Sequence, residues 1–251
     1  MNRHMSLRSG NPALSKNTFK NFEASSSNRM TLEGTINKTI ISLMILLSTA
    51  YYTYSNGDLS YVMIGFIVGL MLAITTIFKK EWAPYTVPLY AAFEGLALGG
   101  ISFIYAEQYY SGMVQQAIFL TFGIFGSLLF AYKTKIIKAS ENFKLGVFAA
   151  TSGIFIVYLI SFIMSFFGNY DSSSSIMSPM NGGLMSIGFS LFVVIIASLN
   201  LVLDFDFIEE GVEQGAPKFM EWYGVFGLLV TLIWLYLEIL RLLAKLHSRR
   251  N

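Results

Sequence analysis

Three acidic residues interrupt otherwise apolar stretches of this sequence: Glu94, Asp204 and Glu238. Asp204 follows an almost unbroken apolar run over 184–203, and Glu238 interrupts a second run that starts at residue 223. A carboxylate in hydrocarbon is costly, so an acid within a membrane-spanning segment indicates a functional site. These acids therefore predict a proton-sensitive ion site in a helical membrane protein.

The chemistry of such a site depends on how close two carboxyl groups come. At about 4 Å two carboxylates cannot both ionise easily, so the pair takes up and releases protons as one unit. Such a pair can hold a gate shut when it is protonated and bind a divalent cation when it is ionised. Calcium prefers oxygen ligands, and Asn200 lies one helical turn before Asp204 on the same face. At 1.5 Å per residue, straight helices place Glu238 closer in depth to Glu94 than to Asp204. If the sixth segment kinks below Asn200, or the seventh lies lower in the membrane, Asp204 and Glu238 meet, and we predict these two as calcium ligands, with Glu94 as a further proton-sensing acid.

Each acid also has a plainer interpretation. Asp204 can be the first solvated residue after a helix, and Asp206 begins a run of acids that is typical of a solvated turn. Glu238 can be the ion-pair partner of Arg241, because side chains three residues apart meet on a helix. Glu94 has no cation in its own apolar run, so we expect its partner in one of the last two segments.

The elements that must position these acids are membrane-spanning helices. Hydrophobic residues make up 54% of the 251 residues and charged residues only 13%, well below the charge content of a soluble domain. Long apolar runs between short polar breaks satisfy their backbone groups only as helices. The predicted fold is thus an all-α polytopic membrane protein. Seven segments long enough to cross a bilayer are expected, at 37–54, 60–78, 84–105, 113–132, 145–167, 183–205 and 222–246.

Lysine and arginine residues set the expected orientation. They gather in alternate connections, within 1–38, at 79–80 and at 133–144. Because positive charges stay on the cytosolic side, we expect a cytosolic N-terminus, with residues 1–35 as a flexible tail and 36–251 as a single seven-helix bundle. The last segment carries Arg241 and Lys245 near its end, which leaves a full crossing or a re-entrant segment open; its length of about 25 residues favours the crossing.

Two Gly-x-x-x-Gly pairs, Gly65 with Gly69 and Gly95 with Gly99, predict close packing between helices. Such spacing places both glycines on one helix face and lets another backbone approach. Small residues are common inside membrane bundles, so packing within one chain is expected rather than dimerisation.

Other chemistry has little support in the sequence. The chain has no cysteine, and its two histidines, His4 and His247, lie near the termini. A zinc site or a histidine-based catalytic triad inside the bundle is therefore not expected. We expect no enzyme activity, no cofactor apart from Ca²⁺ as a permeant or bound ion, and no nucleic-acid partner.

Four stretches carry a resemblance to a known family. They are LNLVLDFDFIEEGVE, APKFMEWYGVFGLLVTLIWLYLEILRLLAKL, SGNPALSKNTF near the N-terminus and PLYAAFEGLALG around Glu94. With these stretches the chain resembles, over nearly its whole length, the Bax inhibitor (transmembrane Bax-inhibitor-motif) family in its bacterial YccA-like branch.

This resemblance implies a seven-helix bundle with the last helix at its centre, in a bacterial cytoplasmic (inner) membrane. It also implies a pH-sensitive calcium leak, in which an Asp at the cytosolic end of the sixth helix pairs with an Asp in the seventh. The first Asp is similar to Asp204, or to Asp206 if the pattern shifts, and the second falls on Glu238, where Glu replaces Asp. Some family members instead modulate a membrane-anchored protease, so a regulatory protein that binds a membrane complex is the alternative function.

Overall fold

The computed structural model describes residues 28–166 and 175–250. Over these residues it forms seven α-helices and no strand, so the predicted all-α class is confirmed. A short 3₁₀ turn, η2 (Lys80–Trp82), precedes the third helix. The helices are α1 (Leu32–Asn56), α2 (Ser60–Phe78), α3 (Ala83–Gln108), α4 (Met113–Lys133), α5 (Glu141–Phe166), α6 (Leu184–Glu213) and α7 (Met220–Arg250).

Six of the described helices, α2 to α7, are long and apolar enough to cross a membrane. The chain is therefore a polytopic membrane protein. α1 reaches 25 residues, but with its many Ser, Thr and Tyr side chains it is not among these six. α7 is one continuous helix of 31 residues, so the last segment does not turn back on itself between Met220 and Arg250.

The acidic run after Asp204 forms helix, not a solvated turn. We expected the sixth segment to end near residue 205, but α6 continues to Glu213. Phe207 and Ile208 are buried among the acids, and this burial holds the last turns of the helix in place. The chain turns away after the helix at Gly215, whose φ of +64° is the left-handed conformation that glycine adopts without strain.

Contacts group the described residues into two compact units. The α1–α3 unit contains residues 28–108 with Asp204–Val230, and the α4–α5 unit contains the described parts of Tyr109–Leu203 and Thr231–Asn251. α6 and α7 thus contribute one stretch to each unit. The predicted single bundle and the central place of the last helix stay predictions.

The predicted N-terminal tail, 1–35, lies mostly outside the described residues, because the description begins at residue 28. Its last part is ordered by contacts. Residues 32–35 already form the first turn of α1, and Met30 is buried.

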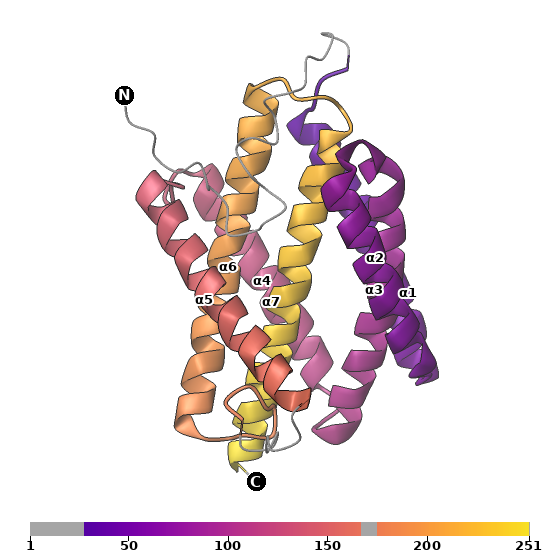
Figure 1. Cartoon of the computed structure of the whole chain (residues 1–251), viewed down its shortest axis with the longest axis vertical. Helices are drawn as coiled ribbons and strands as arrows, with labels where there is room; N and C mark the ends of the chain where they lie inside the picture. The colour runs from indigo at the N-terminus through magenta and orange to yellow at the C-terminus, as the bar shows by residue number, and fades with distance from the viewer. Residues whose placement is uncertain (1–27, 167–174, 251) are drawn as a thin grey trace. The chain divides into compact units, whose positions relative to one another are not determined.

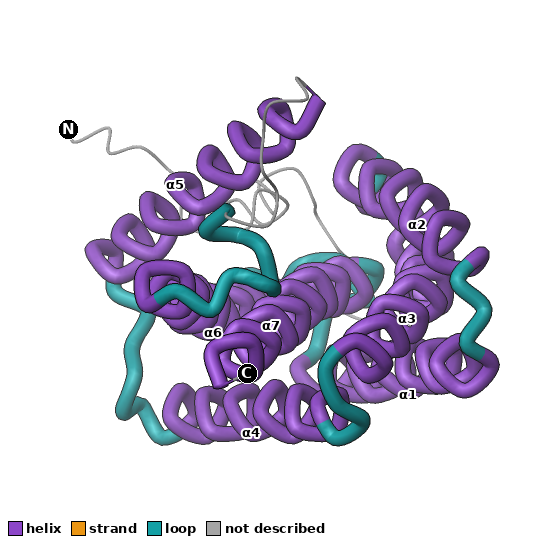
Figure 2. Tube along the Cα trace, turned by 90° about the horizontal axis from the view of Figure 1, so that it is seen from below, coloured by secondary structure: helices purple, strands orange, loops and turns teal. Residues whose placement is uncertain are grey.

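In the α1–α3 unit, α1, α2 and α3 lie side by side (Figures 1 and 2). A Cβ atom built at Gly95 of α3 would lie 2.4 Å from the carbonyl oxygen of Leu46, and one at Gly99 would lie 2.1 Å from that of Ala50. Both distances are far below van der Waals contact, so only glycine allows α3 to approach α1 this closely. This pair packs two helices of the same chain together, as predicted.

The second glycine pair lies on α2 and faces α3. A Cβ atom at Gly65 would lie 2.5 Å from the carbonyl oxygen of Phe93, and one at Gly69 would lie 2.7 Å from Oε1 of Glu94. α2 therefore approaches α3 through its glycines. The approach also determines the surroundings of Glu94.

In the α4–α5 unit, an apolar cluster joins three helices next to Glu238. Ile154 of α5 packs with Val193 and Ile196 of α6, and Trp234 of α7 borders them. Trp234 lies one turn before Glu238 on α7. The cluster therefore fixes the backbone that carries the acid.

Candidate functional site

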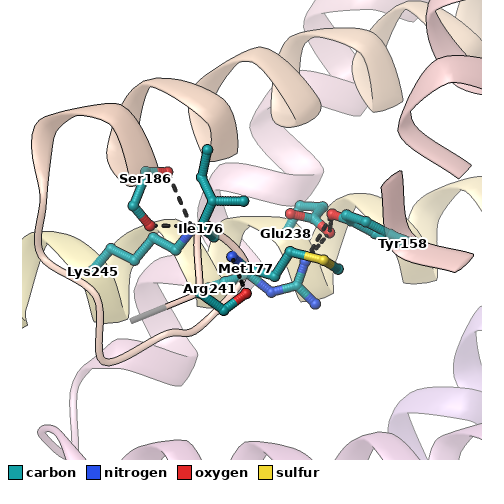
Figure 3. Close-up of polar contacts among 8 residues, drawn as sticks. Tyr158, Ile176, Met177, Ser186, Glu238, Arg241 and Lys245 are labelled. Atoms are coloured by element: carbon teal, nitrogen blue, oxygen red, sulfur yellow. Dashed lines mark hydrogen bonds and ion pairs between the residues drawn. The ribbon is translucent and has the colours of Figure 1, made fainter. Parts of the chain in front are cut away.

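Glu238 lies inside the α4–α5 unit with only 1% of its surface exposed. Its Oε1 accepts hydrogen bonds from the hydroxyl of Tyr158 on α5 and from Nη1 of Arg241, the latter at 2.5 Å. Arg241 Nη1 also donates to the Tyr158 hydroxyl at 2.8 Å. Figure 3 shows the three side chains meeting between α5 and α7.

The plainer interpretation of Glu238, as the ion-pair partner of Arg241, is confirmed. A spacing of three residues on one helix brings the two side chains together, and the guanidinium lies 5.4 Å from the centre of the Tyr158 ring. The aromatic ring adds a cation–π contact to the ion pair. Tyr158 was not predicted, because it lies on a different helix, 80 residues earlier in the chain.

The second oxygen of Glu238 has a different environment. Among the described residues, no donor forms a hydrogen bond to the buried Oε2. A buried carboxylate oxygen without a donor is costly while it is charged. The oxygen is therefore suited to take up a proton or to bind a cation, while Oε1 stays with Arg241 and Tyr158.

Lys245 lies two helical turns beyond Glu238 and is fully buried. Its Nζ donates to the backbone carbonyl of Ile176 at 2.5 Å and to that of Ser186 at 3.1 Å, as Figure 3 shows. Both carbonyls belong to the connection between α5 and α6 or to the start of α6. These partners could not be predicted, because backbone carbonyls leave no residue pattern in a sequence.

Asp204 is fully buried in α6, within the α1–α3 unit. The interpretation of Asp204 as the first solvated residue after the helix is therefore wrong, since nine more helical residues follow it. Asp206, two positions on, is partly exposed. Of the two matches to the family pattern, Asp204 is the more deeply buried.

Asn200 does not stand free as a ligand. Its Nδ2 donates to Oγ1 of Thr151 on α5 at 2.8 Å and to the carbonyl of Ile196 at 2.9 Å. These bonds hold α5 and α6 together inside the α4–α5 unit. They leave the side-chain oxygen Oδ1 as the only atom of the amide that can bind a cation.

The three predicted site acids do not all belong to the same unit. Glu94 and Asp204 belong to the α1–α3 unit, and Glu238 belongs to the α4–α5 unit. The paired site of Asp204 and Glu238 therefore stays a prediction. Glu94 is partly buried, and its carboxyl group lies against Gly69 of α2. Within the described ranges, no group of three or more His, Asp or Glu residues can hold a metal ion.

Comparison with known families now adds to this geometry. The family model described as Bax inhibitor 1 like matches residues 11–248. The chain belongs to the Bax inhibitor family. No curated protein matches the chain. The match covers α1 to α7, so the spanning helices that carry all three acids belong to the family's common region.

A further buried acid of this Bax inhibitor family protein was not predicted. Glu221, in the first turn of α7, is fully buried and forms an ion pair with Lys38 of α1. The two residues lie 183 positions apart, so no local spacing connects them. In the sequence both residues stand among other charges at the edges of apolar runs, and such residues are typically solvated.

Proposed function

We propose that this protein is a pH-sensitive calcium leak channel, in which Glu238 is the central proton-sensing residue and Asp204 is its acidic partner. The observation that carries the proposal is the buried carboxylate of Glu238, with Oε1 bound by two donors and Oε2 by none among the described residues. An ionisable group of this kind within a spanning helix typically marks an ion or proton pathway.

The chemistry follows from the two states of the carboxyl group. When Glu238 is ionised, its negative charge attracts a divalent cation, and Oε2 can bind it. When Glu238 is protonated, that attraction is lost, and the carboxyl group can share its proton with a second acid. We therefore infer that the leak is closed in the protonated state and conducts in the ionised state. Arg241 competes with the cation, because its Nη1 donates to Oε1 of Glu238.

Glu238→Gln tests this proposal in proteoliposomes with a calcium-sensitive dye inside. Gln keeps the size of Glu and cannot ionise, so the wild-type rise in flux with pH should flatten, with flux changing less than about twofold between pH 5 and pH 8. Glu213→Gln is the matched control, because Glu213 is exposed at the end of α6; it should keep the wild-type profile. A Glu238→Gln profile that coincides with that of the wild type removes this mechanism.

We further infer that the chain belongs to the bacterial YccA-like branch and lies in the bacterial cytoplasmic membrane, with its N-terminus in the cytosol. The basic connections support this orientation. Lys79, Lys80, Lys133, Lys135 and Lys138 all lie between helices, in turns, or at helix ends. Positive charges at these places favour the cytosolic side.

A further inference from the structure

A short segment before α1 is bound to the connection between α6 and α7. We call residues 28–31 the N-terminal strap. The backbone N–H of Met30 donates to the carbonyl of Ala216 at 2.7 Å, and that of Lys218 donates to the carbonyl of Asn28 at 3.0 Å. Both bonds lie within the α1–α3 unit. They form an isolated antiparallel bridge around Arg29.

Next to this bridge, the Glu221 carboxylate adds hydrogen bonds and an ion pair. Its Oε1 accepts hydrogen bonds from the backbone N–H and the hydroxyl of Thr31, both at 2.9 Å, and its Oε2 is paired with Lys38. Thr31 is the N-cap of α1, since its hydroxyl oxygen accepts a bond from the N–H of Gly34. One carboxylate therefore joins the first turn of α7 to the first turn of α1.

The electrostatics of this arrangement favour the charged form of the Glu221 carboxylate. The N-terminus of a helix carries a partial positive charge, and Glu221 lies between two such ends, with the Lys38 ammonium beside it. Space is also restricted, because a Cβ atom on Gly34 would lie 2.3 Å from Oε1 of Glu221. A buried carboxylate that lost Lys38 or Thr31 would be left uncompensated.

Glu221 and Glu238 lie on the same helix. α7 is continuous from Met220 to Arg250, and Glu238 lies 17 residues after Glu221 (238 − 221). A helix transmits a rotation or a shift along its axis through its own hydrogen bonds. The backbone hydrogen bonds of this one helix therefore run from the turn that Glu221 joins to α1 to the turn that carries Glu238.

We propose that the N-terminal strap and Glu221 form a latch that restrains α7 and thereby regulates the leak. This inference rests on the proposed function, because the regulated quantity is the calcium flux. Glu221 is a positioning residue in this scheme. It contacts Thr31 and Lys38, and acts on Glu238 only through the helix that carries both acids.

An engineered disulfide tests the latch directly. Arg29 and Pro217 face each other across the antiparallel bridge, a geometry with Cα atoms about 4.5–5.5 Å apart, within the range of a disulfide. The chain has no cysteine of its own, so the double variant Arg29→Cys, Pro217→Cys can form only this disulfide within one chain. Oxidation should lower the calcium flux about tenfold at a pH where the reduced protein conducts. A reductant should restore the flux.

The controls separate the latch from the leak. Each single-cysteine variant, treated with the same oxidant, should keep its flux. A wild-type protein that passes no calcium at any pH overturns the proposed leak, and with it this regulation. A double variant that conducts equally in the oxidised and reduced states, with the disulfide confirmed by mass spectrometry, overturns the latch alone.

Removing the charge of Glu221 should weaken the latch and so raise the calcium flux, the opposite of the effect expected from the disulfide. Glu221→Gln keeps the shape of the side chain but weakens its bonds to Lys38 and Thr31. It should raise the flux at the low pH where the wild type is closed, and slow disulfide formation in the double-cysteine background. Lys38→Met should also raise the flux at low pH and slow disulfide formation. Lys38→Arg keeps the positive charge and should retain most of the wild-type behaviour. Glu213→Gln should change neither the flux nor the rate of disulfide formation. Unchanged flux and unchanged cross-linking in Glu221→Gln would overturn the role of this residue.

Discussion

Gly99→Val should destabilise the protein by about 3 kcal/mol, at the upper end of what overpacking costs. A Cβ atom at this position would lie 2.1 Å from the carbonyl oxygen of Ala50 and 2.9 Å from Cβ of Thr53. A backbone oxygen cannot turn away as a side chain can, so α1 and α3 would have to separate. Thermal and denaturant unfolding of the detergent-solubilised protein measure the loss.

Gly126→Val in α4 is the matched control. Apart from the backbone of α4 itself and the neighbouring residues, no atom of the described part of the chain lies within 4 Å of a Cβ atom built there, so the change adds a side chain without a clash. Because Val is a somewhat better helix former than Gly, the variant should stay within about 0.5 kcal/mol of the wild type. Equal losses in the two variants would show that the close contact between α1 and α3 does not stabilise the protein.

Hydropathy was enough to predict where most helices lie. α2 covers 60–78 as expected, and α4 ends one residue beyond the expected 113–132, because an apolar run in a membrane protein has few alternatives to a helix. The expected end of α6, at residue 205, lies eight residues before the observed end at Glu213. The acidic side chains predict a solvated turn there, whereas in the structure Phe207 and Ile208 bury one face of the same helical turns.

Of the contacts in the candidate site, those within one helix were predictable and those between distant helices were not. The pair of Glu238 and Arg241 was predictable, since both residues lie on one helix at a fixed spacing. Tyr158 and the Lys38–Glu221 pair join helices far apart in the chain. Only the packing of the helices brings such partners together, and a single sequence contains no record of that packing.

Arg241→Met should destabilise the protein by about 3 kcal/mol, because breaking a buried ion pair leaves an uncompensated charge. Glu238 is 1% exposed, whereas the Arg241 side chain is 23% exposed. Solvent near the guanidinium screens part of the attraction, which places the loss at the lower end of the range for buried pairs. Arg250→Met is the control, since Arg250 lies exposed at the end of α7, and it should stay within about 0.5 kcal/mol of the wild type.

The double variant Glu238→Gln, Arg241→Met shows whether Arg241→Met loses stability through charge or through packing. Gln carries no charge, and its side-chain oxygen can still accept the hydrogen bond from Tyr158, so most of the stability lost in Arg241→Met should return. The two single variants and the double variant then give a coupling energy of about 2 kcal/mol between the residues. If the double variant is as unstable as Arg241→Met, the loss comes from the packing of the arginine side chain. Glu238 then needs no positive partner, and its charge is sustained by Tyr158 and the surrounding helices alone.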